Sequence, residues 1–494
     1  MQPIDPLEPG REEMRRLIEQ ATERIVTHVA SLADQPASYS PGGDGPGAEA
    51  LARSLREGLP EEGSPAEPLL DLLFERLVPA SFNTAGPGYM AYIPGGGLFA
   101  AAVADLVADA VNRYVGVWVA APGLAELEAN VVRWFCQMVG YPPAARGYLS
   151  SGGSLANFSA VVTARRERLP EAFLDGILYA GDQVHHSVVK AASLAGFPHG
   201  NVRLIPCDDL FRIRLDALDQ AIAADRRSGL RPFLVVGSAG TTNTGAVDDL
   251  EALADLAARE GLWFHLDAAY GGFFLLTERG RRAMAGAARA DSLTLDPHKG
   301  LFLPYGTGCL LVRDGAALHR AHGAAADYLP ALRRSSSRAP GLDVAPYEEA
   351  PEFTDFCDVS PELSRSFRGL RVWLPLKLYG ANAFRRALDE KLDLAAWAAG
   401  ELEEIPAIEI VARPQLSIVA FRLVVPGTDP AHLDRLNREL LARVNARQRV
   451  YLTGTVVRGV FVLRLSILSF RTHRDRVEAA LEDLRGAIAE LAPG

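Results

Sequence analysis

Long apolar runs are missing from this sequence. The closest approach, over residues 98–111, is interrupted by Asp105 and Asp109. A membrane-spanning helix needs roughly 20 predominantly apolar residues, so the sequence predicts no membrane partner. Residues 1–6 contain no basic region leading into an apolar core, which argues against a secretory signal. We therefore expect a cytoplasmic protein.

Cysteine is scarce, and no long basic block is present. The four cysteines lie far apart and form no Cys-x-x-Cys pair, which argues against a disulfide framework and a zinc site. The formal net charge of −10 disfavours a nucleic-acid partner. Hydrophobic residues make up 48% and charged residues 23% of the 494, as in ordinary globular proteins. A chain of this length has room for two or three domains.

The chain divides into three sections by pattern. Apolar residues recur at helical spacing over residues 11–33, and two shorter helical stretches follow. These helices are too few for a core of their own, so we expect residues 1–85 to pack on a dimer partner. We expect a large domain over residues 86–375 and a small α/β domain over residues 376–494.

Short β-rich runs alternate with helical patterns through the large domain. Strand, helix, strand repetition predicts an α/β fold with a mostly parallel sheet covered on both faces. Ligands of such sheets bind at the carboxyl ends of the strands. The predicted strands are residues 176–180, 202–206, 232–237, 262–266, 292–295 and 308–313, with 418–423 and 459–465 in the small domain.

Lys299 follows one of these strands, after the residues Asp-Pro-His and before a tract with few charges. This context predicts a partly buried amine. Burial lowers the pKa of a lysine because the charged form loses hydration. A neutral amine attacks carbonyl groups, so we predict that Lys299 forms a Schiff base.

Three further segments suggest a binding site. Gly153 and Ser154 open a helical stretch whose N–H groups suit a phosphate, unless Ser154 is a plain N-cap. Asp267 follows a buried strand and either pairs with a protonated ring nitrogen or caps the next helix. His185, beside His186, could stack on an aromatic ring, bind a metal or be solvated. No metal-ligand cluster accompanies it, so we predict no metal.

Together these groups specify a phosphate site, a carboxylate for a ring nitrogen, an imidazole for a ring face and an amine for an aldehyde. Such a pocket suits pyridoxal 5′-phosphate. The chain resembles the group II, or aromatic-L-amino-acid, decarboxylases from about residue 68 onward, and more loosely before it. The resemblance implies a homodimer with the aspartate-aminotransferase-like fold (fold type I) of pyridoxal-phosphate enzymes. It rests on segments 151–154, 182–185, 240–242, 265–270, 296–299 and 364–368.

The resemblance implies roles for individual residues. Lys299 would be the Schiff-base lysine and Asp267 the partner of the pyridine nitrogen. Tyr328, on a mobile loop, would donate a proton to the substrate Cα with help from His185. The residues implied to contact the cofactor are Gly153, Ser154, His185, Thr242, Asp267, Asp296, His298 and Lys299.

Three positions depart from the family pattern. Asp296 stands where aromatic decarboxylases often have asparagine, and an anionic Asp296 would repel a phosphate. Gly300 replaces a tryptophan, and glycines fill residues 95–97 where side chains are usual, so we expect both changes to bear on the substrate. Decarboxylation of an aromatic L-amino acid is favoured. Acidic substrates, with Arg113 as a weak candidate to bind them, and aliphatic substrates stay open. So do an aminotransferase, a decarboxylation-dependent aldehyde synthase and a cofactor-free scaffold.

Overall fold

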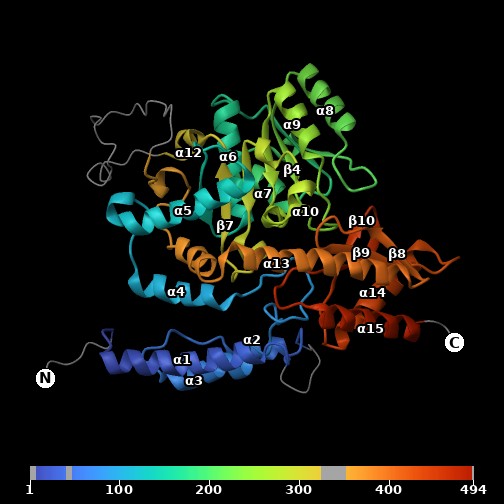
Figure 1. The fold of residues 1–494 in the computed structure, drawn as a ribbon. Helices are drawn as coiled ribbons and strands as arrows, with labels where there is room; N and C mark the ends of the chain where they lie inside the picture. The colour runs from blue at the N-terminus through green and yellow to red at the C-terminus, as the bar shows by residue number, and fades with distance from the viewer. Residues whose placement is uncertain (1–6, 40–46, 324–351, 492–494) are drawn as a thin grey trace.

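A seven-stranded sheet forms the centre of the large domain in the computed structural model, which describes residues 7–39, 47–323 and 352–491 (Figure 1). Its strands are β1 (Arg146–Ser150), β2 (Gly176–Gly181), β3 (Val202–Ile205), β4 (Arg231–Ser238), β5 (Trp263–Asp267), β6 (Ser292–Leu295) and β7 (Gly308–Val312). They lie in the order β1-β7-β6-β5-β4-β2-β3. All neighbouring strands are parallel except β7, which is antiparallel to β1 and β6. The predicted mostly parallel sheet is confirmed.

Successive residues of each strand enter two different cores. In β2, Ile177 and Tyr179 pack in one core, whereas Leu178 and Ala180 pack in the other. The first core is completed by α5 (Pro122–Val139), α8 (Leu215–Arg227) and α9 (Leu250–Glu260). The second is completed by α6 (Gly153–Arg168), α7 (His186–Leu194) and α12 (Gly315–His322). Burial on both faces explains why these strands read as nearly continuous apolar runs.

A smaller antiparallel sheet lies at the carboxyl-terminal end of the chain (Figure 1). It contains β8 (Ile408–Ala412), β9 (Ile418–Leu423), β10 (Thr453–Val457) and β11 (Val460–Ser466), covered by α14 (Pro430–Ala446) and α15 (Arg474–Leu491). The long helix α13 (Gly369–Glu403) connects it to the large domain and is interrupted at Gly380 (φ 70°, ψ 154°). Helix α13 runs across residue 375, where the large domain was predicted to end. The three-part division of the chain stays a prediction.

The amino-terminal helices form a layer beneath α4 (Phe99–Val111) and α13 (Figure 1). They are α1 (Arg11–Ser31), α2 (Ala48–Ser54) and α3 (Ala66–Asp71), continued by η1 (Leu72–Leu77). None of the residues of α1 is buried, and its apolar side chains Met14, Leu17, Ile18 and Val26 are each about half exposed (47–51%). This layer therefore has an apolar surface that the other described residues leave exposed.

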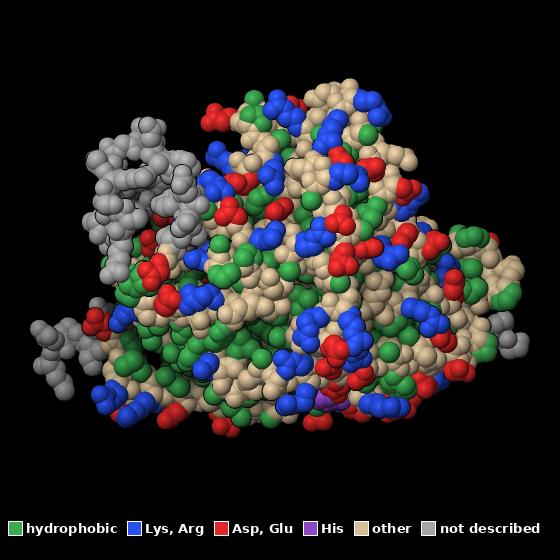
Figure 2. Space-filling model, turned by 45° about the horizontal axis from the view of Figure 1, so that its top comes forward, with side chains coloured by type: hydrophobic (Ala, Val, Ile, Leu, Met, Phe, Trp, Pro, Cys, Tyr) green, Lys and Arg blue, Asp and Glu red, His purple; other side chains and the backbone are tan. Residues whose placement is uncertain are grey.

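The molecular surface mixes both signs of charge. Figure 2 shows acidic and basic side chains interspersed over the face in view, with hydrophobic side chains gathered in a hollow. Within the described parts of the chain, no helix combines the length and apolar character needed to span a membrane.

Candidate active site

The carboxyl ends of β1, β2, β4, β5 and β6 meet at one edge of the large sheet, where a cavity of about 300 Å³ opens. This volume is at the lower end of the range for small-molecule sites, roughly 300–1,000 Å³. Tyr328 lies outside the described residues. All eight residues predicted to contact the cofactor line the cavity: Gly153, Ser154, His185, Thr242, Asp267, Asp296, His298 and Lys299.

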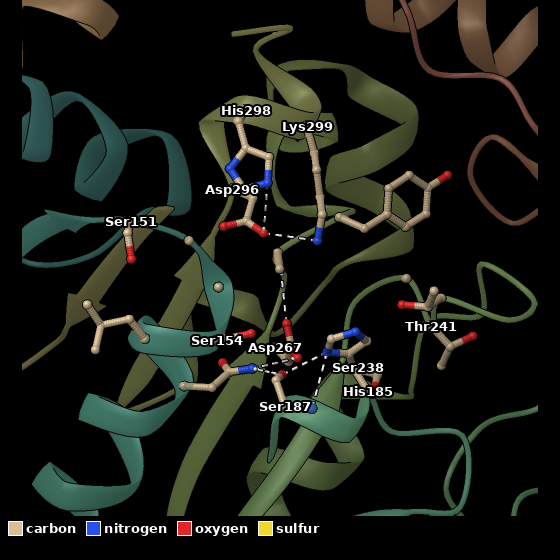
Figure 3. Close-up of a pocket in the computed structure, with 18 residues that line it drawn as sticks. Ser151, Ser154, His185, Ser187, Ser238, Thr241, Asp267, Asp296, His298 and Lys299 are labelled. Atoms are coloured by element: carbon tan, nitrogen blue, oxygen red, sulfur yellow. Dashed lines mark hydrogen bonds and ion pairs between the residues drawn. The ribbon is translucent and has the colours of Figure 1, made fainter. Parts of the chain in front are cut away.

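Lys299 forms an ion pair that its sequence context did not suggest. The short helix α11 (Pro297–Gly300) follows β6 and brings the Lys299 Nζ to 2.9 Å from Oδ2 of Asp296 (Figure 3). Burial alone would lower the pKa of Lys299, but the charge and hydrogen bond of Asp296, with a contribution from Asp267, raise it above its ordinary value. The expected lowered pKa is therefore wrong, because desolvation is offset by a carboxylate in direct contact.

Asp296 lies against the amino terminus of α6. A Cβ at position 153 would lie 3.0 Å from the Asp296 Oδ2, so any residue other than glycine would require Asp296 to move. Oδ1 of Asp296 is buried and has no hydrogen-bond partner among the residues described. Gly152 is the N-cap residue of α6 and Ser154 is exposed, so the alternative that Ser154 is a plain N-cap is wrong. The unpaired N–H groups of such a helix start suit an anion.

Asp267 is the last residue of β5 and faces the cavity from the side opposite Lys299 (Figure 3). Its Oδ2 accepts a hydrogen bond from Nδ2 of Asn157 (3.0 Å), and its Oδ1 accepts one from the N–H of Ala269 (3.2 Å). The next helix, η4 (Gly272–Leu276), has Gly271 as its N-cap. The alternative that Asp267 caps this helix is therefore wrong.

His185 is the N-cap residue of α7 and is half-buried at the cavity wall. Its Nδ1 accepts the N–H of Ser187 (3.3 Å) and lies 2.8 Å from the Ser187 Oγ. Burial lowers the pKa of His185, with the charge of Asp267 opposing, so the ring is neutral at physiological pH. A flat, neutral imidazole at this place suits stacking on an aromatic ring.

Two loops complete the cavity. After β4, Gly240 has φ 97°, and a Cβ there would lie 2.5 Å from the Tyr270 ring. A glycine is thus required for the turn that presents Thr242. His298, on α11, lies with its Nδ1 2.6 Å from the carbonyl oxygen of Thr307, to which the protonated Nδ1 donates. This bond turns the other ring nitrogen of His298 toward Asp296, 3.7 Å away.

The two glycine departures differ in their location. Gly300 does not line the cavity: a Cβ there would lie 2.6 Å from the Cβ of Phe273, in the core. These contacts assign Gly300 a packing role, and the expectation that it bears on the substrate stays a prediction. A Cβ on Gly95 would instead lie 3.0 Å from the ring of Tyr305 and 3.1 Å from the carbonyl oxygen of His298, beside the site.

Several cavity residues were not predicted. They include Asn157, Ser187, Ser238 and Tyr270. Asn157 follows Ser154 by three residues on the same helix, a spacing that places both on one face. Farther out, Arg464 on β11 donates to the carbonyl oxygens of Asn243 and Tyr92 and to Thr453, and so ties β11 to the loop that carries Thr242. Nothing local in the sequence indicated this role.

The family model of the pyridoxal-dependent decarboxylase conserved domain matches residues 49–424. The chain belongs to this decarboxylase family. An aromatic-L-amino-acid decarboxylase of Bacillus atrophaeus is 34% identical over 98% of both chains. A tryptophan decarboxylase, TDC2, of Camptotheca acuminata is 31% identical over 98% of this chain and 96% of its own. The crystal structure of Oryza sativa TDC with PLP and tryptamine matches with a TM-score of 0.89 at 28% identity, over 99% of this chain and 100% of the other.

The enzyme is thus a pyridoxal-phosphate-dependent amino-acid decarboxylase of fold type I. Its cavity fits that cofactor on independent grounds. It offers an amine for the aldehyde, a buried carboxylate opposite, a neutral imidazole on the wall and a helix amino terminus for the phosphate. The unpartnered Oδ1 of Asp296 leaves one acceptor for a donor group of a ligand.

Proposed function

We propose that the enzyme decarboxylates an aromatic L-amino acid to the corresponding amine and CO2. The named activities of the relatives support this proposal. The charge of the cavity supports it too: among the lining residues that the structure describes, Lys299 is the only lysine or arginine. Within the described lining, no second lysine or arginine is therefore placed to pair with a substrate side-chain carboxylate. Arg113, the candidate for that role, is exposed and does not line the cavity of this chain.

The proposed roles follow from what each side chain presents to the cavity. Lys299 holds the cofactor through its amine, and Asp267 keeps the ring nitrogen protonated. His185 covers the ring face. The amino terminus of α6, with Gly153 and Ser154, receives the phosphate, flanked by Asp296 and His298, and Thr242 contacts the cofactor from the loop after β4. When bound, pyridoxal phosphate withdraws electrons from the bonds at the substrate Cα.

Loss of CO2 must be balanced by a proton delivered to Cα. We assign this proton to Tyr328, with His185 assisting from the cavity wall.

The test of the proposed function combines a substrate panel with product analysis. Aromatic, acidic and aliphatic L-amino acids are supplied singly, and amine and CO2 are measured. Amine formed from glutamate or leucine in preference to tryptophan, tyrosine or phenylalanine would contradict the aromatic assignment. Transfer of the amino group to pyruvate or 2-oxoglutarate would indicate an aminotransferase. Aldehyde with ammonia and peroxide would indicate an aldehyde synthase.

Lys299→Ala tests the site itself. Without its amine the protein should lose the visible absorbance of the lysine-bound cofactor, and retention of that absorbance would end the assignment.

We also propose a homodimer, in which a second copy covers the exposed apolar side chains of α1 and of α4. In α4, Leu106 is 56% exposed although most of the helix is apolar. Leu17→Glu, in the centre of the α1 surface, should weaken the dimer in light-scattering measurements. Arg15→Glu, at an exposed ion-paired position of the same helix, is the matched control. A wild-type protein that is monomeric at micromolar concentration would contradict the proposal.

A further inference from the structure

A buried chain of hydrogen bonds ends on Asp267. Its central member is Asn157 of α6, which is 1% exposed. The Asn157 Nδ2 lies 3.0 Å from Oδ2 of Asp267 and 2.9 Å from Oγ of Ser187. Its Oδ1 lies 2.7 Å from Oγ1 of Thr294 and 3.1 Å from Nε2 of His265. All the hydrogen-bonding capacity of the Asn157 amide is therefore used.

The direction of every bond in this chain follows from Asp267. An ionised carboxylate only accepts hydrogen bonds, so the NH2 group of Asn157 must face Asp267. The Asn157 oxygen consequently faces His265 and needs a donor there. Nε2 of His265 must therefore carry a proton. Burial lowers the pKa of His265 to about 4, with the charge of Asp267 opposing, so the ring is neutral. Because the single ring proton is on Nε2, Nδ1 carries none.

The chain of hydrogen bonds continues from the unprotonated Nδ1 of His265. Nδ1 of His265 lies 2.8 Å from Oγ of Ser292, which must donate to it. The Ser292 oxygen in turn accepts the indole N–H of Trp263 at 2.8 Å, and an indole N–H can only donate. Hydrogen bonds thus run one way from Trp263 through Ser292, His265 and Asn157 to Asp267. All five residues are at most 8% exposed.

The sheet supplies the spacing of this chain. Trp263, His265 and Asp267 alternate along β5, and a period of two places them on one face of the strand. On β6, Ser292 is paired with His265 and Thr294 with Asp267. The polar side chains therefore form a ladder across two adjacent buried strands, with Asn157 contributed by the helix above.

We propose that His265 and Asn157 are positioning residues: through the chain that starts at Trp263, they fix the ionised carboxylate of Asp267 toward the cofactor ring nitrogen. This inference rests on the role proposed for Asp267. A hydrogen bond to a carboxylate stabilises its charged form. If Asn157 turned over, its oxygen would face the carboxylate instead, and Asp267 would hold the ring proton less well. His265 prevents this by keeping its proton on Nε2.

The wild-type protein provides the first test. Selective ¹⁵N-histidine labelling of the cofactor-free protein shows which ring nitrogen of His265 carries the proton at neutral pH, with the signal assigned by its absence in His265→Gln. We expect the neutral form protonated on Nε2. A proton on Nδ1 alone would overturn the inference, because the Asn157 amide would then have to turn its NH2 group away from Asp267.

The second test reads the ring nitrogen directly, by ¹⁵N NMR of protein loaded with ring-¹⁵N pyridoxal phosphate over a range of pH. Hydrogen bonds to charged groups are strong enough for their loss to be measurable here. Compared with the wild type, Asn157→Leu and His265→Phe should release the ring proton at lower pH, at about tenfold higher proton concentration. His265→Gln retains an N–H at a similar reach and should recover most of this loss. Unchanged titration in Asn157→Leu and His265→Phe would overturn the inference.

Two controls separate a specific effect on the ring nitrogen from a general loss of stability and from a failure of the role proposed for Asp267. Asn437→Leu removes another fully buried asparagine, which bonds to the backbone at Leu423 and Leu433 in the small domain. It should lower stability and leave the ring nitrogen unaffected; a shift in this variant would contradict a specific role for Asn157. In Asp267→Ala the ring proton should be lost. Retention there would contradict the proposed role of Asp267 itself, whereas loss there with no effect of Asn157→Leu would overturn only the positioning role.

Discussion

Gly300, the residue after the reactive lysine, has no side chain because Phe273 already fills the space beside it. A Cβ at Gly300 would lie 2.6 Å from the Cβ of Phe273 and 3.1 Å from its Cδ2. Phe273 is fully buried and packs edge-on against Phe135 (centroids 5.1 Å apart, 76°), so it has no room to withdraw. Overpacking of this kind costs about 1–3 kcal/mol. Gly300→Ala should therefore lower the urea midpoint of the cofactor-free protein and leave relative kcat/KM among substrates unchanged.

Two further variants identify the cause. Gly400→Ala in α13 is the matched control, since a Cβ there meets nothing within 4 Å and should stabilise the helix by about 0.5–1 kcal/mol. Phe273→Gly removes the obstructing atoms, so the cost of Gly300→Ala should largely disappear in that background, as a double-mutant cycle would show. An unchanged urea midpoint together with altered substrate preference in Gly300→Ala would refute this account and return Gly300 to the substrate pocket.

Asp296→Asn removes the carboxylate that raises the pKa of Lys299, so burial should then lower that pKa. Capture of pyridoxal phosphate, which needs the neutral amine, should reach its maximal rate at lower pH in stopped-flow absorbance, and an unshifted pH profile would contradict the pairing. In the cofactor-free wild type this pair stabilises the fold below the ordinary lysine pKa, and the stabilisation is lost as pH rises through the raised pKa. Tyr328→Phe should slow amine formation and increase aldehyde, and a normal amine rate without aldehyde would exclude Tyr328 as donor. Arg464→Met leaves carbonyl groups unpaired at about 1–3 kcal/mol each, so cofactor affinity measured by titration should fall; unchanged affinity would limit Arg464 to stability.

The strands that the sequence missed share a place in the sheets, although one edge strand, β3, was predicted. Six of the large-domain strands were readable as apolar runs because most are buried on both faces. The three missed strands, β1, β8 and β10, all lie at a sheet edge. Strand β1 reads Arg-Gly-Tyr-Leu-Ser and β10 reads Thr-Gly-Thr-Val-Val, with a glycine in each. An edge strand has one partner and weaker demands on composition, so its pattern merges with that of a loop.

Most of the predicted cavity residues follow a predicted strand, and parallel strands bring their carboxyl ends together. Gly153 and Ser154 follow the missed strand β1 and were predicted from the turn that opens a helix. The ionisation state of Lys299 was not predictable. It depends on Asp296, which precedes it by three residues, a spacing at which side chains meet only if the backbone turns helically. The one-turn helix α11 was too short to leave a periodic signal. The sequence therefore indicated the burial of Lys299 but not its contact with the Asp296 carboxylate, which has the opposite effect on the pKa.

Most of the polar residues that support Asp267 lie inside strands β5 and β6, where an apolar sequence pattern predicts only core residues. Trp263, His265 and Asp267 alternate along β5, and the same strand places Phe264 and Leu266 in the apolar core on its other face. A buried strand in which every second residue is polar is costly unless each polar group finds a partner, as these do through β6 and Asn157. Such alternation within an otherwise apolar run thus indicates a second layer behind a site. Here the proposed positioning residues carry the support of Asp267 from the strand end into the sheet itself.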